Sequence, residues 1–167
     1  PYLRGEPRVL SVSATTFSEL GTRGRGYFYP PTHGQKFTVE DLASAYFRLE
    51  GGKTLTLEAS WATYGKYNDS FGVSLFGSNG GAELEVNDYV DKNTLRVFTD
   101  IGGSPVEMRP APVARHGHTV VAGEFTDLIL HGKPATAVGL DGVRRAQVIQ
   151  ATYQSALEGR EVVIEDL

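Results

Sequence analysis

Residues 124–167, EFTDLILHGKPATAVGLDGVRRAQVIQATYQSALEGREVVIEDL, contain two helical patterns joined by a Gly-x-Pro turn and followed by a short strand pattern at 161–164. Gly132 and Gly159 stand where the two helices are predicted to end. Each helix carries an apolar stripe at helical spacing: Val121, Phe125, Leu128 and Ile129 in the first, and Ala146, Ile149, Tyr153 and Ala156 in the second. We expect these helices to cover a sheet, with Phe125, Ile149 and Tyr153 buried against it.

The sequence upstream of this tail is rich in strand patterns. Strands are predicted at 8–17, 43–49, 54–61, 70–76, 82–86 and 94–99, with a shorter candidate at 106–108. Strands that come first, joined by tight turns, with helices late, indicate an α+β domain: a mostly antiparallel open sheet with helices on one face. The second face carries Thr, Ser, Arg, Tyr and Glu, which suit either water or a subunit interface.

The hairpin around Gly51 and Gly52 has two possible registers. A two-residue loop would put the apolar residues of the two strands on opposite faces. A three-residue loop, residues 50–52 with Gly52 left-handed, sets Phe47 opposite Leu55 and Ala45 opposite Leu57. We favour the second register, because it keeps the apolar residues on one face.

Composition limits the classes of function. The 167 residues suffice for one domain, and a net charge of −4 argues against general nucleic-acid binding. The sequence has no cysteine, which excludes disulfides, thiolate metal sites and cysteine nucleophiles. It has no apolar run of the ~20 residues that a membrane span needs and no signal-like segment at its start, so a cytoplasmic location is expected.

Four stretches in order carry a family resemblance. They are GEP and the strand after it at 5–14, VEDLA through the hairpin at 39–61, LFGSNGGA and the strand after it at 75–86, and the tail. Together they resemble the C-terminal domain of the Gfo/Idh/MocA oxidoreductases, the glucose–fructose oxidoreductase and inositol dehydrogenase family. The resemblance covers nearly the whole chain. It implies a fold like the C-terminal domains of dihydrodipicolinate reductase and glyceraldehyde-3-phosphate dehydrogenase.

Full-length members of that family join an N-terminal Rossmann domain to this sheet domain, and transfer hydride between a nicotinamide and a sugar, polyol or related substrate. The resemblance implies that residues 1–167 are a single substrate-binding and oligomerisation domain of an NAD(P)-dependent oxidoreductase. Its partners would be its own Rossmann domain, further copies through the sheet, and a sugar-like molecule. Since the chain starts at Pro1 and its one methionine is Met108, we expect the Rossmann domain upstream. The alternative is a domain of a non-catalytic relative that serves as a sugar sensor or co-repressor.

The chain has no recognisable dinucleotide site. A pyrophosphate cradle needs Gly-x-Gly-x-x-Gly between a strand and a helix. The nearest cluster, Gly21, Gly24 and Gly26, is followed by Pro30-Pro31, which forbids a helix there. We therefore expect no cofactor in this chain and NAD or NADP in the parent protein.

The family's proton-transfer motifs also have no counterpart. Its Glu-Lys-Pro motif is absent, and Lys133-Pro134 follows Gly132 in a turn. Asp127 and His131 have the family's Asp-x-x-x-His spacing but lie in the tail helix, so we interpret them as an ordinary i, i+4 surface pair. No catalytic residue is predicted, and the isolated chain is expected to be inactive.

The remaining candidates for chemistry are few. One loop offers donors and stacking faces that suit a hydroxylated or anionic ligand, at Arg23, Arg25, Tyr27, Tyr29 and His33. The competing interpretation is an ordinary exposed or oligomer-contact loop. His116 and His118 have no third ligand nearby, so no metal site is predicted. Glu83 and Glu85 share a strand face and are interpreted as solvated carboxylates.

Overall fold

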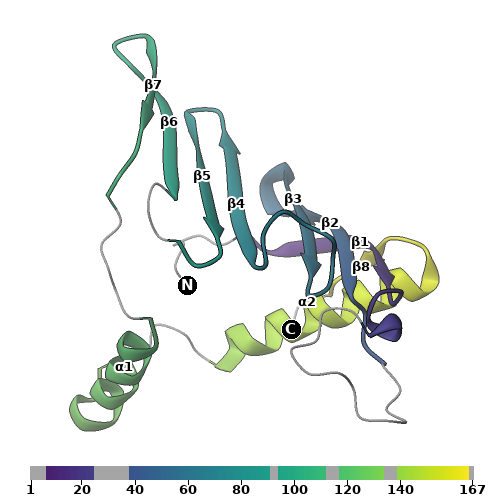
Figure 1. The fold of residues 1–167 in the computed structure, drawn as a ribbon. Helices are drawn as coiled ribbons and strands as arrows, with labels where there is room; N and C mark the ends of the chain where they lie inside the picture. Colours follow the sequence, from purple (N-terminus) through teal and green to yellow (C-terminus); the bar gives the residue numbers. More distant parts are fainter. Residues whose placement is uncertain (1–6, 25–37, 91–93, 112–116, 134–138, 166–167) are drawn as a thin grey trace. The chain divides into compact units, whose positions relative to one another are not determined.

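The computed structural model describes residues 7–24, 38–90, 94–111, 117–133 and 139–165 (Figure 1). The chain divides into two compact units, one formed by Pro1–Tyr64 with Gly132–Leu167 and the other by Gly65–His131. Each unit contains one four-stranded antiparallel sheet. The predicted α+β class, with antiparallel strands first and helices late, is therefore confirmed, but the strands form two sheets rather than the one open sheet expected.

The sheet of the first unit has the strand order β3-β2-β1-β8. Its strands are β1 (Val9–Phe17), β2 (Leu42–Leu49), β3 (Lys53–Ser60) and β8 (Val162–Val163), and helix α2 (Gly139–Glu158) belongs to the same unit. The short closing strand pairs with the first strand, Ser11 opposite Val163, so the two ends of the sequence meet in one sheet.

The hairpin between β2 and β3 has the register predicted from the sequence. Phe47 lies opposite Leu55, and Ala45 lies opposite Leu57. The connection is the three-residue turn η2 (Glu50–Gly52), in which Gly51 and Gly52 have φ of +71° and +70°. Residues with a side chain rarely adopt that conformation, which explains the paired glycines.

The core of the first unit lies between α2 and the apolar face of the sheet, as Figure 1 shows for the course of the helix along β1, β2 and β8. Its buried members are Val12, Ala45, Phe47, Ala151 and Val162. The buried side of α2 is formed by Val148, Ala151 and Ser155, whose small side chains allow a close approach to β1.

The predicted stripe of α2 was wrong. Ile149 and Tyr153 are 57% and 48% exposed, because they lie beside the buried line of Ala151 and Ser155 rather than on it. Hydrophobic periodicity gives weight to large side chains, whereas this helix uses small ones at its contact with the sheet.

The second unit is a meander with the strand order β4-β5-β6-β7. Its strands are β4 (Ser70–Gly77), β5 (Gly80–Asn87), β6 (Leu95–Ile101) and β7 (Ser104–Met108), followed in the chain by α1 (Gly117–His131). The sequence Gly-Ser-Asn-Gly-Gly at 77–81 indicates a turn, and the structure has one between Gly77 and Gly80 that joins β4 to β5. Gly80 has φ of +149° there. Adding a Cβ at Gly80 would bring it within 2.6 Å of the Phe98 carbonyl oxygen, so a larger residue does not fit.

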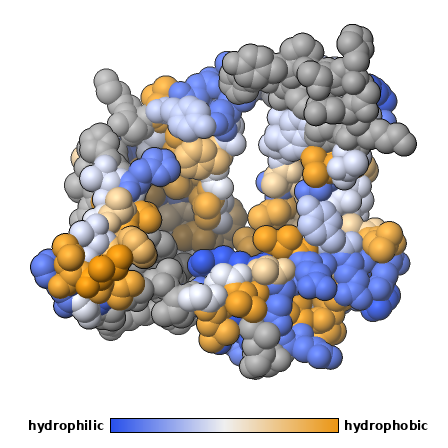
Figure 2. Space-filling model, turned by 90° about the horizontal axis from the view of Figure 1, so that it is seen from below, coloured by the Kyte–Doolittle hydropathy of each residue, from blue (hydrophilic) through white to orange (hydrophobic). Residues whose placement is uncertain are grey.

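Much apolar surface remains exposed, and orange hydrophobic patches are visible on the face drawn in Figure 2. The expected burial of Phe125 was also wrong, since this side chain is 63% exposed on α1. In the second sheet, β4 exposes Phe71, Val73 and Leu75 by more than half. None of the helices that the structure describes is both long and apolar enough to cross a membrane.

Candidate functional site

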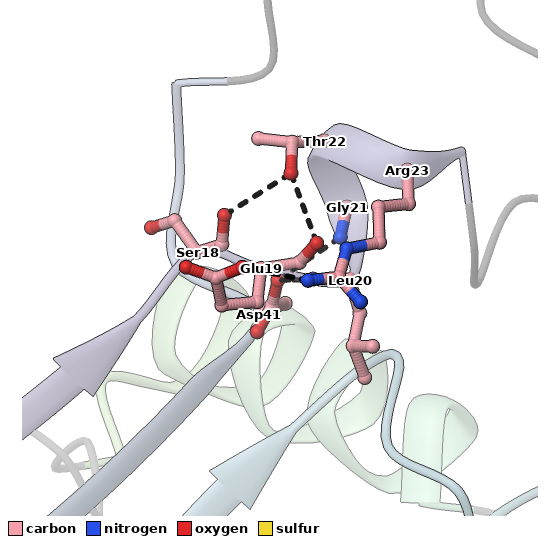
Figure 3. Close-up of polar contacts among 7 residues, drawn as sticks. All are labelled: Ser18, Glu19, Leu20, Gly21, Thr22, Arg23 and Asp41. Atoms are coloured by element: carbon pink, nitrogen blue, oxygen red, sulfur yellow. Dashed lines mark hydrogen bonds and ion pairs between the residues drawn. The ribbon is translucent and has the colours of Figure 1, made fainter.

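The candidate ligand loop begins on a short turn held by a buried carboxylate. Asp41, just before β2, is 2% exposed, and its Oδ2 accepts hydrogen bonds from the N–H groups of Leu20 (2.5 Å) and Gly21 (2.9 Å). These bonds fix the 3₁₀ turn η1 (Gly21–Arg23), as Figure 3 shows. A buried carboxylate is tolerated only with such donors, so the turn and the burial of Asp41 depend on each other.

Arg23 is the one residue of the candidate ligand set that lies in the described part of the chain. Its Nη2 is 3.0 Å from Oε2 of Glu19, and both side chains are about 70% exposed. An exposed pair of this kind contributes little to stability, so the guanidinium stays accessible to solvent. The other four residues, Arg25, Tyr27, Tyr29 and His33, lie outside the described residues.

A second group of polar contacts surrounds the neighbouring residue, Glu40. Its Oε1 accepts a 2.7 Å hydrogen bond from the Tyr153 hydroxyl, and its carbonyl accepts one of 2.7 Å from Nε1 of Trp61. The hydrogen bond to Glu40 stabilises the protonated phenol and raises the pKa of Tyr153. The phase of Trp61 with Leu55, Leu57 and Ala59 in the sequence indicates a core position, but this side chain is 40% exposed because its indole reaches back to Glu40 beyond the end of β3.

A cleft of about 770 Å³ lies against the first sheet. Hydroxyl-bearing side chains from three adjacent strands line it, together with a carboxylate: Ser13, Thr15, Ser44, Tyr46, Thr56 and Glu58. These residues alternate with the core residues along their strands, so they belong to the polar face of the sheet. Ser155, Gly159 and Arg160, at the C-terminal end of α2 and just after it, also line the cleft. Such a surface can offer hydrogen bonds to a polyhydroxylated ligand or to another protein.

Glu161 also lines this cleft. Its Oε1 accepts hydrogen bonds from the Ser11 hydroxyl and from Nε of Arg48, the latter at 3.2 Å. The Ser11 hydrogen bond, helped by the charge of Arg48, lowers the pKa of Glu161. The Arg48 guanidinium also lies 5.6 Å from the centre of the Tyr46 ring, so one arginine connects the carboxylate to the aromatic ring.

The lesser candidates have ordinary structural environments. Asp127 and His131 form an exposed i, i+4 pair, with Nε2 3.9 Å from Oδ1, as expected from their spacing. Glu83 pairs with Arg96 on the adjacent strand at 2.8 Å, and Glu85 accepts a hydrogen bond from Asn87. His118 lies in the first turn of α1, whereas His116 is outside the described residues.

No group of three or more potential metal ligands occurs among the residues that the structure describes. Sequence reasoning missed Asp41 and Glu40 as organisers of this region. A hint was available, since an acidic pair immediately before a strand and after a long loop is positioned to bind the loop's backbone amides.

Comparison with known proteins finds a sequence relative. No protein-family model matches the chain. The chain is 26% identical over 162 residues to D-glucoside 3-dehydrogenase from Escherichia coli K12. The aligned residues cover 96% of this chain and 44% of that protein.

Solved structures share the fold. Levoglucosan dehydrogenase in complex with NADH and L-sorbose matches with a TM-score of 0.71 at 18% identity, over 96% of this chain and 46% of that one. Aldose–aldose oxidoreductase from Caulobacter crescentus, in complex with glycerol, matches with a TM-score of 0.64 at 21% identity, over 94% of this chain and 42% of that one. The chain thus spans less than half the length of each of these proteins. It matches the C-terminal domain of Gfo/Idh/MocA-like oxidoreductases, which confirms the resemblance drawn from its sequence motifs.

Proposed function

We propose that this chain is the C-terminal substrate-binding and oligomerisation domain of an NAD(P)-dependent oxidoreductase that acts on a sugar, polyol or related carbonyl compound. The observation that carries the proposal is the 26% identity with D-glucoside 3-dehydrogenase across 96% of the chain. The structural likeness to a levoglucosan dehydrogenase bound to NADH points to the same class of chemistry.

The sequence motifs indicate which domain would bind the nucleotide and which would contact the substrate. The nicotinamide nucleotide would be bound by a Rossmann domain, because this chain has no Gly-x-Gly-x-x-Gly motif between a strand and a helix. When bound, the nicotinamide supplies a hydride acceptor or donor. Residues 1–167 would supply hydrogen-bond donors and acceptors to the substrate hydroxyls, with Arg23 and the loop that follows it as the candidates.

The two faces of the first sheet would then have separate tasks. One is covered by α2, and the other carries the hydroxyl-rich cleft and is polar along β1, β2 and β3. We propose that this polar face lies against a second copy of the chain. The protein would act in the cytoplasm, as expected from the sequence.

The proposal is tested by measuring nucleotide binding and catalytic turnover separately in the isolated chain and in the longer protein. Isothermal titration of the isolated 167-residue chain with NADH should give no binding at micromolar concentration, and the chain should show no turnover. The longer protein, which includes the residues upstream of Pro1, should reduce NAD⁺ or NADP⁺ with a D-glucoside, levoglucosan or inositol as substrate. Micromolar NADH binding by the isolated chain would refute the assignment of the cofactor to another domain.

The alternative is a sugar sensor or co-repressor of the same fold. It predicts that the longer protein binds a sugar of this panel with unchanged affinity in the presence and absence of nucleotide, and that no substrate produces NADH absorbance. Upstream Glu-Lys-Pro and Asp-x-x-x-His motifs favour the enzyme, and their absence favours the sensor.

A further inference from the structure

The segment between β1 and β2 starts and ends at one point of the sheet. The N–H of Asp41 donates a 2.8 Å hydrogen bond to the carbonyl of Phe17, the last residue of β1. Residues 18–40 therefore leave and rejoin the sheet at neighbouring positions. We call this point, where Phe17 and Asp41 are hydrogen-bonded, the base of the segment. The contacts that fix the backbone at the base determine the direction in which the segment begins.

Asp41 fixes the base through its side chain as well. One carboxylate oxygen accepts the N–H groups of two consecutive residues, Leu20 and Gly21 (Figure 3). Consecutive amides can point at one oxygen only when the backbone turns, so these bonds select the η1 conformation. Since Asp41 is 2% exposed, water cannot readily replace the protein donors.

Arg23 is the last residue of the η1 turn. The Thr22 hydroxyl donates to the Glu19 carbonyl at 2.9 Å, and the N–H of Gly24 donates to the Gly21 carbonyl at 2.9 Å. Gly24 then leaves the turn with φ of +74°. The Arg23 backbone is therefore positioned by the hydrogen bonds of the η1 turn, which begins at the two residues whose amides Asp41 binds.

Asp41 and the residue before it, Glu40, also connect the η1 turn to the rest of the first unit. The Asp41 carbonyl accepts a 2.5 Å hydrogen bond from Ser60 at the end of β3, and Glu40 contacts Tyr153 of α2 and the Trp61 indole. These contacts use main-chain oxygens and the Glu40 carboxylate, and none uses the Asp41 carboxylate. Loss of that carboxylate should therefore release the turn while the surrounding contacts remain.

We propose that Asp41 is a positioning residue for the substrate, which acts through the η1 turn to hold Arg23 where it can bind a hydroxylated or anionic substrate group. The substrate part of this inference rests on the proposed function. The positioning of the turn rests on the geometry alone, and the two parts are tested separately.

The first test measures amide hydrogen exchange in the 167-residue chain. Asp41→Ala should accelerate exchange in the 18–24 peptide by about 10- to 100-fold, because two donors lose a buried partner. Asp41→Asn keeps one acceptor oxygen and should restore most of the protection. Asp88→Ala is the matched control, since Oδ1 of Asp88 also accepts two consecutive amides, those of Asn68 and Asp69, but on an exposed side chain in the second unit.

Two results of this experiment would overturn the positioning role. One is unchanged exchange in the 18–24 peptide of Asp41→Ala. The other is an equal acceleration in peptides from β1, β2 and α2, which would mean that Asp41 supports the whole unit rather than the turn.

The second test uses the longer, catalytically complete protein with a sugar substrate. Asp41→Ala should raise the KM for the sugar about tenfold with kcat nearly unchanged and the KM for the nucleotide unaltered. Arg23→Ala should give a similar rise, and the double variant no further rise, because both changes remove one interaction. A fall in kcat with unchanged KM would contradict the substrate role. If no sugar is turned over at all, the proposed function fails, while hydrogen exchange still decides the role of Asp41 in the turn.

Discussion

The backbone N–H of Ala14 in β1 donates a 2.9 Å hydrogen bond to the Oγ of Ser155 on α2, a side chain that is 1% exposed. The same hydroxyl donates at 2.6 Å to the carbonyl of Arg160, in the turn before β8. One serine thus satisfies a strand donor and a turn acceptor that are far apart in the sequence. It does so beside the residues that precede β8, where this strand does not pair with β1.

Replacing Ser155 with alanine should therefore destabilise the first unit by about 1–3 kcal/mol, since a buried donor and a buried acceptor lose their partner. Alanine favours the helix slightly, by about 0.5 kcal/mol, which does not offset this loss. Urea denaturation measures the difference. Gln150→Ala, on the exposed side of the same helix, should be nearly neutral, and equal stability of the two variants would contradict the role of Ser155.

The glycines of η2 allow a comparison between two Gly→Ala changes. Gly52→Ala should cost about 1–2 kcal/mol, because φ of +70° is strained for an L-residue although no atom lies within 4 Å of the added Cβ. Gly142→Ala in α2 also meets open space but has helical φ, and should stabilise the chain by about 0.5–1 kcal/mol. Thermal unfolding of both variants checks the opposite signs.

The register between β2 and β3 predicts unequal costs for two residues that face each other. Phe47 is 4% exposed and its partner Leu55 is 46% exposed. Phe47→Ala should destabilise the chain by about 3–5 kcal/mol, whereas Leu55→Ala should cost roughly 1 kcal/mol. Denaturant midpoints of the isolated chain measure both. Similar costs would mean that a partner covers the outer strand in solution.

The lowered pKa of Glu161 predicts that this residue contributes to the loss of folding stability at low pH. Its pKa in the folded state lies below the usual value of 4.5, so the unfolded state binds its proton more readily. This stabilisation is complete above about pH 4.5 and is lost as the pH falls through the lower, folded-state pKa. Glu161→Gln should therefore reduce the loss of stability between about pH 6 and pH 3, as measured by urea midpoints. Glu165→Gln, a neighbouring exposed change, is the control, and an unaltered pH profile in Glu161→Gln would refute the prediction.

Self-association provides a separate prediction for the polar face. If this face meets a second copy, light scattering should find dimers or larger species at high micromolar concentration. Thr56→Arg places a long cation among the residues that line the cleft and should shift the mass towards monomer. Gln150→Arg on the opposite side of the unit should not. Monomer alone at high concentration would argue against the interface.

Much of this architecture could be predicted from local sequence patterns. Alternating side chains gave the strands, the paired glycines gave the hairpin, and Gly132 and Gly159 mark the helix ends with φ of +62° and +65°. These signals involve neighbouring residues, so they survive without tertiary information.

The features that sequence patterns missed depend on distant partners. The buried side of α2 uses Ala151 and Ser155, which carry little hydrophobic signal, and Asp41 reads as an ordinary acidic residue until its two amide donors are seen. The separation into two four-stranded sheets was also invisible, because strand patterns do not say which hairpins continue one sheet. Of the candidate ligand residues, only Arg23 lies where the structure describes the chain.

The composition of the first unit from both ends of the sequence has a consequence for synthesis. β1 forms its last backbone pairing with residues near the C-terminus, where the N–H of Ile164 donates to the Leu10 carbonyl at 2.9 Å. A nascent chain leaves the ribosome from its N-terminus, so β1, β2 and β3 wait for α2 and β8 while the whole of Gly65–His131 is being translated. The long-range closure raises the contact order and slows folding, whereas the local hairpins of β4 to β7 can form as they emerge. A product that stops before α2 would therefore leave a β1 edge unpaired and a sheet without its helix, and would be suited to recognition by chaperones or proteases.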